Sequence, residues 1–191
     1  MAGALLPILV KELTRPLHFL NVAGGPAIDS LNTLILPNKK QPEVLAERAI
    51  AIEVLDLDEA GPDFGARALP SLSREGGTLS AIRVAFRNVP YNWNNAADLK
   101  PVLTEAQARR ALVICSSEGG LFEYGSDTEI EENLKVLRAF PEVLAVVGSV
   151  TRADEPVQSY TEDGKSSNSP TWPGRFSGVN WKDRLENHPG D

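Results

Sequence analysis

The stretch LHFLNVAGGPAIDSLNTL, residues 17–34, decides the fold of this chain. It opens with an apolar run at 17–20, which predicts a short buried strand. A turn of small residues follows at 23–27, and the apolar residues then recur at helical spacing, at Ile28, Leu31, Leu34 and Ile35. The order of strand, glycine turn and helix brings backbone N–H groups and a helix N-terminus to the place where many proteins hold a nucleotide, although an ordinary connection can have the same order.

Four later segments have the composition of strands: 49–57, 79–89, 111–115 and 143–150. Helices are expected between them, at 64–69, from a capping box at 104–107 to Arg110, and from a second box at 126–129 to about Phe140. Prolines are expected to stop the helices at Pro70 and Pro141, and 37–42 to form a surface turn followed by a helical turn at 43–48. Because strands alternate with helices, the sequence predicts an α/β fold: a Rossmann-like, open, mostly parallel sheet with helices on both faces.

The chain is predicted to form one α/β domain over residues 1–150. Residues 151–191 are rich in Ser, Gly, Pro and charge and predict an irregular segment, with one more short element around 179–185. The apolar patch at 5–10 predicts an N-terminal helix or arm packed on the core, and it is too short to cross a bilayer.

Composition narrows the function classes. The net charge of −7 over 191 residues and the isoelectric point near 5.0 argue against nucleic acid as a general partner. The single cysteine, Cys115, excludes an internal disulfide framework and fits a cytoplasmic protein. With only two histidines besides, a Cys/His metal site is not expected.

Ligands of open α/β sheets bind beyond the carboxyl ends of the strands. Those ends are predicted at 21–27, at Asp56 and Asp58, at 88–93 and at 116–120. An acid that ends the second strand suits a ribose, because a carboxylate accepts hydrogen bonds from both vicinal hydroxyls. The plainer interpretation, in which the two aspartates only begin a loop or cap the next helix, stays open.

The order NVAGGPA, then EVLDLD, then an apolar strand ending in SSEGG, resembles class I S-adenosylmethionine-dependent methyltransferases. The resemblance covers roughly residues 17–150. In that family the first strand ends in an acid followed by three alternating glycines, and the second ends in the ribose-binding acid. Asn21 stands at the position of the first acid, and Ala23, Gly25 and Ala27 stand at the glycines. The resemblance thus implies cofactor-binding roles for the following residues: Asn21, Ala23, Gly24, Gly25, Pro26, Asp56, Asp58, Asn88, Ser116 and Ser117.

The implied activity is methyl transfer from S-adenosyl-L-methionine to an acceptor that is a small molecule or a protein. The cofactor carries the reactive group, so the protein mainly aligns the acceptor and excludes water. Glu118, Tyr91 and His18 are possible general bases, but no spacing singles one out, and the catalytic residue and the oligomeric state stay open. His18, inside an apolar run, equally fits a core histidine, and Tyr91 and Trp93 equally fit simple packing.

Two other classes remain. VLDLDEAG and VICSS are similar to the motifs of haloacid dehalogenase-type phosphatases, which would make Asp56 the nucleophile, Asp58 the general acid and Ser116 the phosphate ligand. The second is a non-catalytic α/β module that binds a nucleotide or a partner. A nicotinamide-dependent dehydrogenase is disfavoured because GGPA lacks the G-x-G-x-x-G spacing.

Overall fold

The computed structural model describes residues 9–12, 14–149, 158–160 and 166–168. Its centre is a sheet of five parallel strands in the order β3-β2-β1-β4-β5. The strands are β1 (Leu17–Val22), β2 (Ile50–Leu55), β3 (Val84–Val89), β4 (Leu112–Ser117) and β5 (Val143–Gly148). The α/β, Rossmann-like fold expected from the sequence is therefore confirmed.

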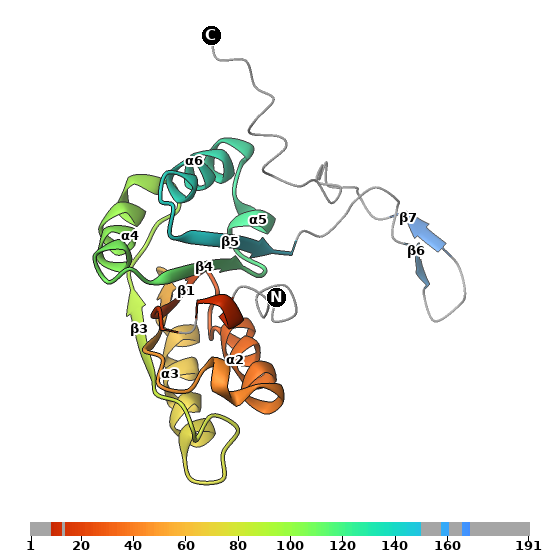
Figure 1. Cartoon of the computed structure of the whole chain (residues 1–191). Coiled ribbons are helices and arrows are strands. Elements are labelled where there is room, and N and C mark those ends of the chain that lie inside the picture. The colour runs from red at the N-terminus through yellow and green to blue at the C-terminus, as the bar shows by residue number, and fades with distance from the viewer. Residues whose placement is uncertain (1–8, 13, 150–157, 161–165, 169–191) are drawn as a thin grey trace. The chain divides into compact units, whose positions relative to one another are not determined.

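Helices cover both faces of this sheet (Figure 1). On one face lie α2 (Ile28–Lys40) and α3 (Ala60–Ser73), and on the other lie α4 (Leu99–Ala108) and α6 (Asp127–Arg138). The short helix α5 (Leu121–Tyr124) follows β4 directly, and two 3-10 turns, η1 (Pro42–Val44) and η2 (Ala96–Asp98), lead into β2 and α4. Each helix crosses from the end of one strand to the start of the next, as parallel pairing requires.

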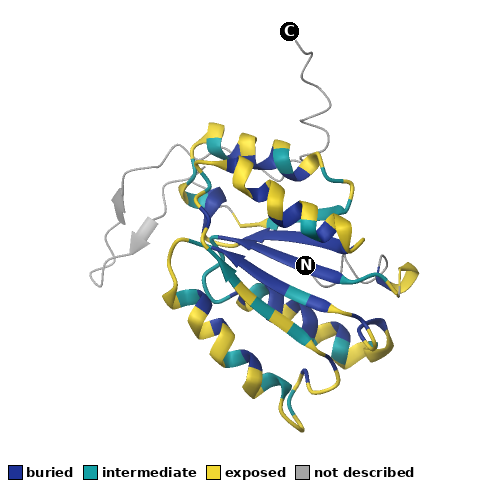
Figure 2. Cartoon of the chain, turned by 90° about the vertical axis from the view of Figure 1, so that its left-hand side faces the viewer, coloured by how far each residue is buried: buried dark blue, intermediate teal, exposed yellow. Residues whose placement is uncertain are grey.

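The central strand β1 and its neighbour β4 are buried along their whole length, because helices cover them on both faces. The edge strand β3 is more exposed, and Figure 2 shows the burial falling from the middle of the sheet outwards. Alternation along β1 sends Phe19 and Asn21 towards α2, and His18 and Leu20 towards α4. The two faces of β1 therefore present different side chains to the helices that cover them.

Arg48 ties the N-terminal segment to the sheet. Its side chain is only 4% exposed, and the guanidinium donates to the carbonyls of Val44 (3.1 Å), Arg15 (2.7 Å) and Leu9 (3.2 Å). Leu9 is buried in the core, which agrees with the expectation of an N-terminal helix or arm for the described part of that segment. Burial lowers the pKa of Arg48, and the nearby Glu12 partly offsets this.

Two predicted helix stops were wrong. α2 continues through Pro37 to Lys40, so 37–42 is not a separate surface turn, and the helical turn expected at 43–48 is the shorter η1. α3 begins at Ala60 and continues through Pro70 to Ser73. Both prolines lie near the ends of helices, so only a few C-terminal residues follow each of them. The carbonyls of Pro37 and Pro70 still accept the N–H groups of Gln41 and Arg74.

Two other boundaries also moved. β3 begins at Val84 rather than at residue 79, because turns bonded from Gly77 to Ile82 take up the preceding residues. α4 begins at Leu99, so the box at 104–107 lies inside the helix and caps nothing. The second box is confirmed: Ser126 accepts from the Glu129 N–H, and the Glu129 carboxylate accepts from the Ser126 N–H, which lowers the pKa of Glu129.

The chain divides into two compact units, residues 1–149 and 150–191. In the second, β6 (Gln158–Tyr160) pairs antiparallel with β7 (Ser166–Asn168). The short element expected at 179–185 lies outside the described residues. Within the part of the chain that the structure describes, no helix is both long and apolar enough to cross a membrane.

Candidate functional site

The order of the strands reverses between β1 and β4, because β2 continues the sheet on one side of β1 and β4 on the other. The loops after these two strands therefore leave in opposite directions, which is where open α/β sheets bind ligands. The turn after β1 lies at this point. Ala23, Gly25 and Ala27 adopt left-handed backbone angles there, with φ of 50°, 49° and 53°. These are the three positions matched to the alternating glycines.

The Asn21 side chain forms the base of the turn and is completely buried. Its amide nitrogen donates to Asp29 Oδ1 and to Ser116 Oγ, both at 2.7 Å, and its amide oxygen accepts from Ser30 Oγ at 2.7 Å. Both amide hydrogens and one oxygen lone pair are therefore in use. Asn21 positions the turn rather than projecting from it, and it joins β1, α2 and β4.

Asp56 connects the end of β2 to the same turn. Its Oδ2 lies 3.3 Å from the Gly25 nitrogen, and its Oδ1 accepts the Asp58 N–H at 3.0 Å. Asp58 itself is exposed. The structure thus brings Asp56 and the glycine turn together, while the side chain of Asp58 lies at the rim.

Glycines pack the neighbouring elements closely against the turn. A methyl group at Gly61 would lie 2.8 Å from the Gly25 Cα, and one at Gly65 would lie 2.4 Å from the Pro26 carbonyl oxygen. A methyl group at Gly120 would lie 2.6 Å from the Ala23 carbonyl oxygen. These contacts were not predicted from the sequence, although the spacing of Gly61 and Gly65 by about one helical turn is a sign of close helix packing.

Ser116 and Ser117 are both buried at the end of β4. Ser116 accepts from Asn21, and the Ser117 hydroxyl accepts the Leu121 N–H at 2.9 Å at the start of α5. Asn88, at the end of β3, is half-buried, and its amide oxygen has no hydrogen-bond partner among the residues that the structure describes. Asp29 Oδ2 is likewise buried without a partner in the described chain. Among the described residues, two buried oxygens thus lack partners: Asp29 Oδ2 near the reversal point, and Asn88 Oδ1 at the end of β3, which β2 separates from β1.

Of the possible general bases, two have internal roles. Tyr91 is buried and its hydroxyl donates to Asn133 Oδ1, while the Asn133 amide donates to the Trp93 carbonyl at 2.8 Å. These bonds fix the loop after β3 to α6, and burial raises the pKa of Tyr91. His18 lies in the second position of β1, away from the carboxyl edge of the sheet. Glu118 is exposed beside the turn.

His18 lies beside a row of charged groups under α4. Its Nε2 lies 3.3 Å from Oε1 of the buried Glu53, and the same oxygen binds the Arg87 guanidinium. Arg87 also binds Glu105 at 3.0 Å, and Glu105 in turn binds Arg109. The hydrogen bond to Glu105 and the charge of Glu53 raise the pKa of Arg87. Glu53 Oε2 has no partner among the described residues.

Cys115 should resist alkylation in the folded protein. It is completely buried in β4, and burial raises its pKa to about 12, with the charge of Asp29 adding to the effect. Iodoacetamide at pH 8.5, followed by mass spectrometry, should label Cys115 at least about a hundredfold more slowly in buffer than in urea, because the thiolate is the nucleophile. Equal labelling rates in both solvents would contradict the buried position.

The same shift predicts the direction of alkaline unfolding. The unfolded thiol ionises near its ordinary pKa of about 8.5, whereas the folded one stays protonated up to about 12. The unfolded state therefore binds fewer protons between these values, and the free energy of unfolding should fall as the pH rises through this window. Cys115→Ala should flatten that fall in urea titrations at pH 8 and pH 10.

The phosphatase interpretation receives little geometric support. Asp56 follows β2 and Ser116 ends β4, and β1 lies between these strands. Two strand spacings of about 4.8 Å separate their positions by roughly 10 Å. The Ser116 hydroxyl is also bonded to Asn21 within the core. Among the described residues no group of three His, Cys, Asp or Glu side chains is placed to hold a metal ion.

The fold and the site define an α/β protein of Rossmann-like architecture with a small-residue turn at its reversal point. Comparison with protein-family models, with curated proteins and with solved structures gives no match for this chain.

Proposed function

We propose that this chain binds S-adenosylmethionine over the turn after β1 and transfers its methyl group to an acceptor. The observation that carries the proposal is the position of Asp56, whose carboxylate lies 3.3 Å from the Gly25 nitrogen. A carboxylate has about four lone-pair sites, so Asp56 can keep its two backbone bonds and still accept from ribose hydroxyls. The backbone turns sharply at the three left-handed positions, so that it can lie close beneath such a ligand.

The amino-acid part of the cofactor also finds matching groups. The first turn of α2 has no side-chain cap, since Ala27 occupies the N-cap. The N–H groups of this first turn are suited to a carboxylate. Asp29 Oδ2 and the Asn88 amide oxygen have no hydrogen-bond partner among the residues that the structure describes. The first is an acceptor for an ammonium group, and the second suits the exocyclic amine of an adenine.

When bound, the cofactor supplies a methyl group on a positively charged sulfur, which needs no protein nucleophile. The residues of the chain therefore hold and orient the ligand. Asp29 and Asp56 favour its positive charge, and Glu118 is the exposed carboxylate beside the turn that is placed to take a proton from an acceptor.

Asp56→Asn should weaken binding of S-adenosylmethionine and of its demethylated product by at least tenfold, about 1.4 kcal/mol. The asparagine oxygen keeps one backbone bond, so the melting temperature should change little. Isothermal titration measures the affinity, and Asp63→Asn, an exposed aspartate one turn into α3, is the matched control. An unchanged affinity in Asp56→Asn would remove the ribose role.

The same titration with NAD, and with Mg²⁺ plus a phosphate analogue, distinguishes a methyltransferase from a dehydrogenase, a phosphatase and a non-catalytic module. If the folded wild-type chain binds neither S-adenosylmethionine nor its demethylated product, the proposal is overturned in favour of a non-catalytic module. Tight binding of the Mg²⁺–phosphate analogue alone would favour the phosphatase, with Asp56 as its nucleophile.

A further inference from the structure

Large apolar side chains are exposed where three segments leave the carboxyl edge of the sheet. The segments are 23–29 after β1, 56–64 after β2 and 118–127 after β4. Between 47% and 77% of each of these side chains is exposed: Ile28, Leu57, Phe64 and Tyr124. We call these four residues the carboxyl-edge surface. Of the large exposed apolar side chains in the described chain, only Val10 and Leu36 lie elsewhere.

The three segments are adjacent in space. Gly61 of the second segment approaches the Gly25 Cα of the first so closely that an added methyl group would lie 2.8 Å away. Gly120 of the third approaches Ala23 of the first in the same way, at 2.6 Å. The exposed side chains therefore belong to one edge of the domain rather than to scattered sites.

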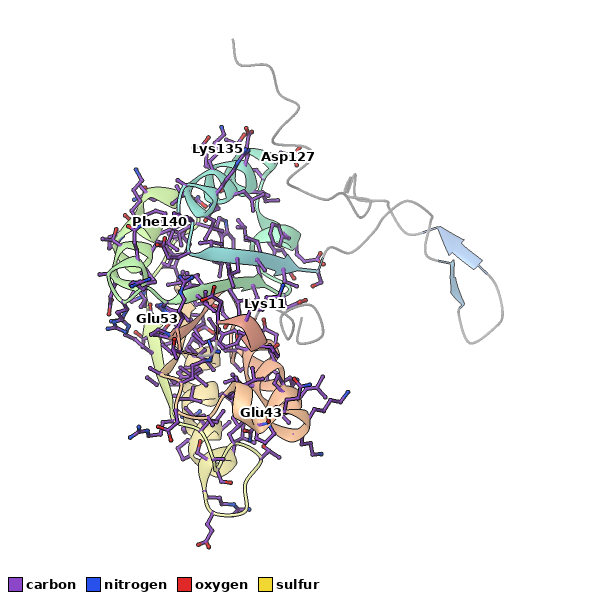
Figure 3. The ribbon with its side chains drawn as sticks, in the orientation of Figure 1. Lys11, Glu43, Glu53, Asp127, Lys135 and Phe140 are labelled. Atoms are coloured by element: carbon purple, nitrogen blue, oxygen red, sulfur yellow. The ribbon has the colours of Figure 1, made fainter. Side chains whose placement is uncertain are left out.

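Every charged residue in these three segments is acidic: Asp29, Asp56, Asp58, Glu59, Asp63, Glu118, Glu123 and Asp127. The overall net charge does not account for this, because each connection that leads into β1, β2, β3 or β4 contains arginine: Arg15, Arg48, Arg74, Arg83, Arg109 and Arg110. Figure 3 shows Asp127 and Glu43 on opposite faces of the sheet. Glu43 lies in η1, before β2 and outside the three segments, so it serves as an acidic control.

We infer that the carboxyl-edge surface docks a basic, amphipathic segment of a partner protein. Apolar side chains that are about half exposed or more are suited to packing against a partner's surface, whereas a small-molecule site is concave and buries its lining. The acids around them attract lysine and arginine and repel anionic lipids and nucleic acid. This inference goes beyond the proposed function and does not depend on the cofactor.

The test uses the full chain and a fluorescent peptide of about fourteen residues, long enough to form a helix on binding. The peptide has leucines on one helix face and lysines on the other. Anisotropy titrations should give a dissociation constant of about 10 μM, typical of a transient docking contact. Peptides with glutamate in place of lysine, or serine in place of leucine, should bind at least about tenfold more weakly.

Two double variants locate the contact. Leu57→Ser with Phe64→Ser removes apolar area, and Glu59→Lys with Glu118→Lys reverses charge; each should weaken binding of the Leu/Lys peptide by at least about tenfold. The controls Leu36→Ser, at a side chain 43% exposed near the far end of α2, and Glu43→Lys should leave it unchanged.

The inference would be overturned if the wild-type chain did not bind the Leu/Lys peptide below about 100 μM, or if both double variants bound it as tightly as wild type does. Binding of phosphatidylcholine vesicles that depends on Leu57 and Phe64, without peptide binding, would replace the protein partner by a membrane surface. Peptide binding with no response to S-adenosylmethionine would support the docking surface while the proposed function fails.

Discussion

Replacing Arg48 by methionine should lower the free energy of unfolding by about 3 kcal/mol or more. Methionine keeps most of the buried volume but removes the arginine donors from the carbonyls of Leu9, Arg15 and Val44. Of these, the Leu9 carbonyl still accepts the Glu12 N–H. Buried polar groups that lose a charged partner each destabilise the fold, and these three hold the N-terminal segment against the start of β2. Urea denaturation followed by circular dichroism gives the difference.

Two companion variants make the Arg48 result specific. Arg48→Lys should fall between wild type and methionine, because an ammonium cannot match the spread of the planar guanidinium donors. Arg83→Met, at an exposed arginine before β3, should change stability by less than about 0.5 kcal/mol. A loss below about 1 kcal/mol in Arg48→Met would mean that water or rearrangement satisfies the three carbonyls.

Arg87→Met should also destabilise the protein by about 3 kcal/mol. The substitution leaves the carboxylate of Glu53, which is buried in the sheet (Figure 3), without its cationic partner. Among the described residues, only His18 then remains beside this carboxylate. Glu53→Met should cost much less, because Arg87 is half exposed and retains Glu105. The double variant should therefore recover most of what Arg87→Met loses, as a double-mutant cycle in urea would measure.

Arg109→Met is the control for this cycle, because Arg109 binds the same Glu105 at the surface and should change stability by less than about 0.5 kcal/mol. If the double variant is as unstable as Arg87→Met, the loss of stability comes from lost packing of the arginine stem over β3 and not from the unpaired carboxylate of Glu53.

The sequence predicted the α/β class because the relevant signals are local. Residues 17–20 and 111–115 are continuous apolar runs, and helices cover both faces of the strands that they form. The box at Ser126 also marks a true helix start. The box at 104–107 failed because the same spacing occurs by chance inside a helix that starts earlier, at Leu99.

The helix ends predicted from proline were wrong where tertiary packing extends the helices beyond the proline. Leu69 and Leu72 pack on the core on either side of Pro70, so burial there outweighs the lost N–H donor. The contacts of the candidate site were beyond local reasoning for another reason. Asn21 meets Ser116 from 95 residues away, and only the strand order brings Asp56 to Gly25. Polar Ser30, inside an apolar helix face, was the one available sign of the Asn21 network.

The central position of β1 has a consequence for synthesis on the ribosome. Leu17 pairs with Ile50 on one side but with Leu112 on the other. The nascent chain therefore leaves the backbone N–H and C=O groups along one edge of the apolar strand β1 unpaired until β4 has left the exit tunnel. Such late pairing slows folding and invites aggregation. Chains stalled before residue 112 should consequently recruit chaperones that bind extended apolar segments, and chains released after β5 should no longer need them.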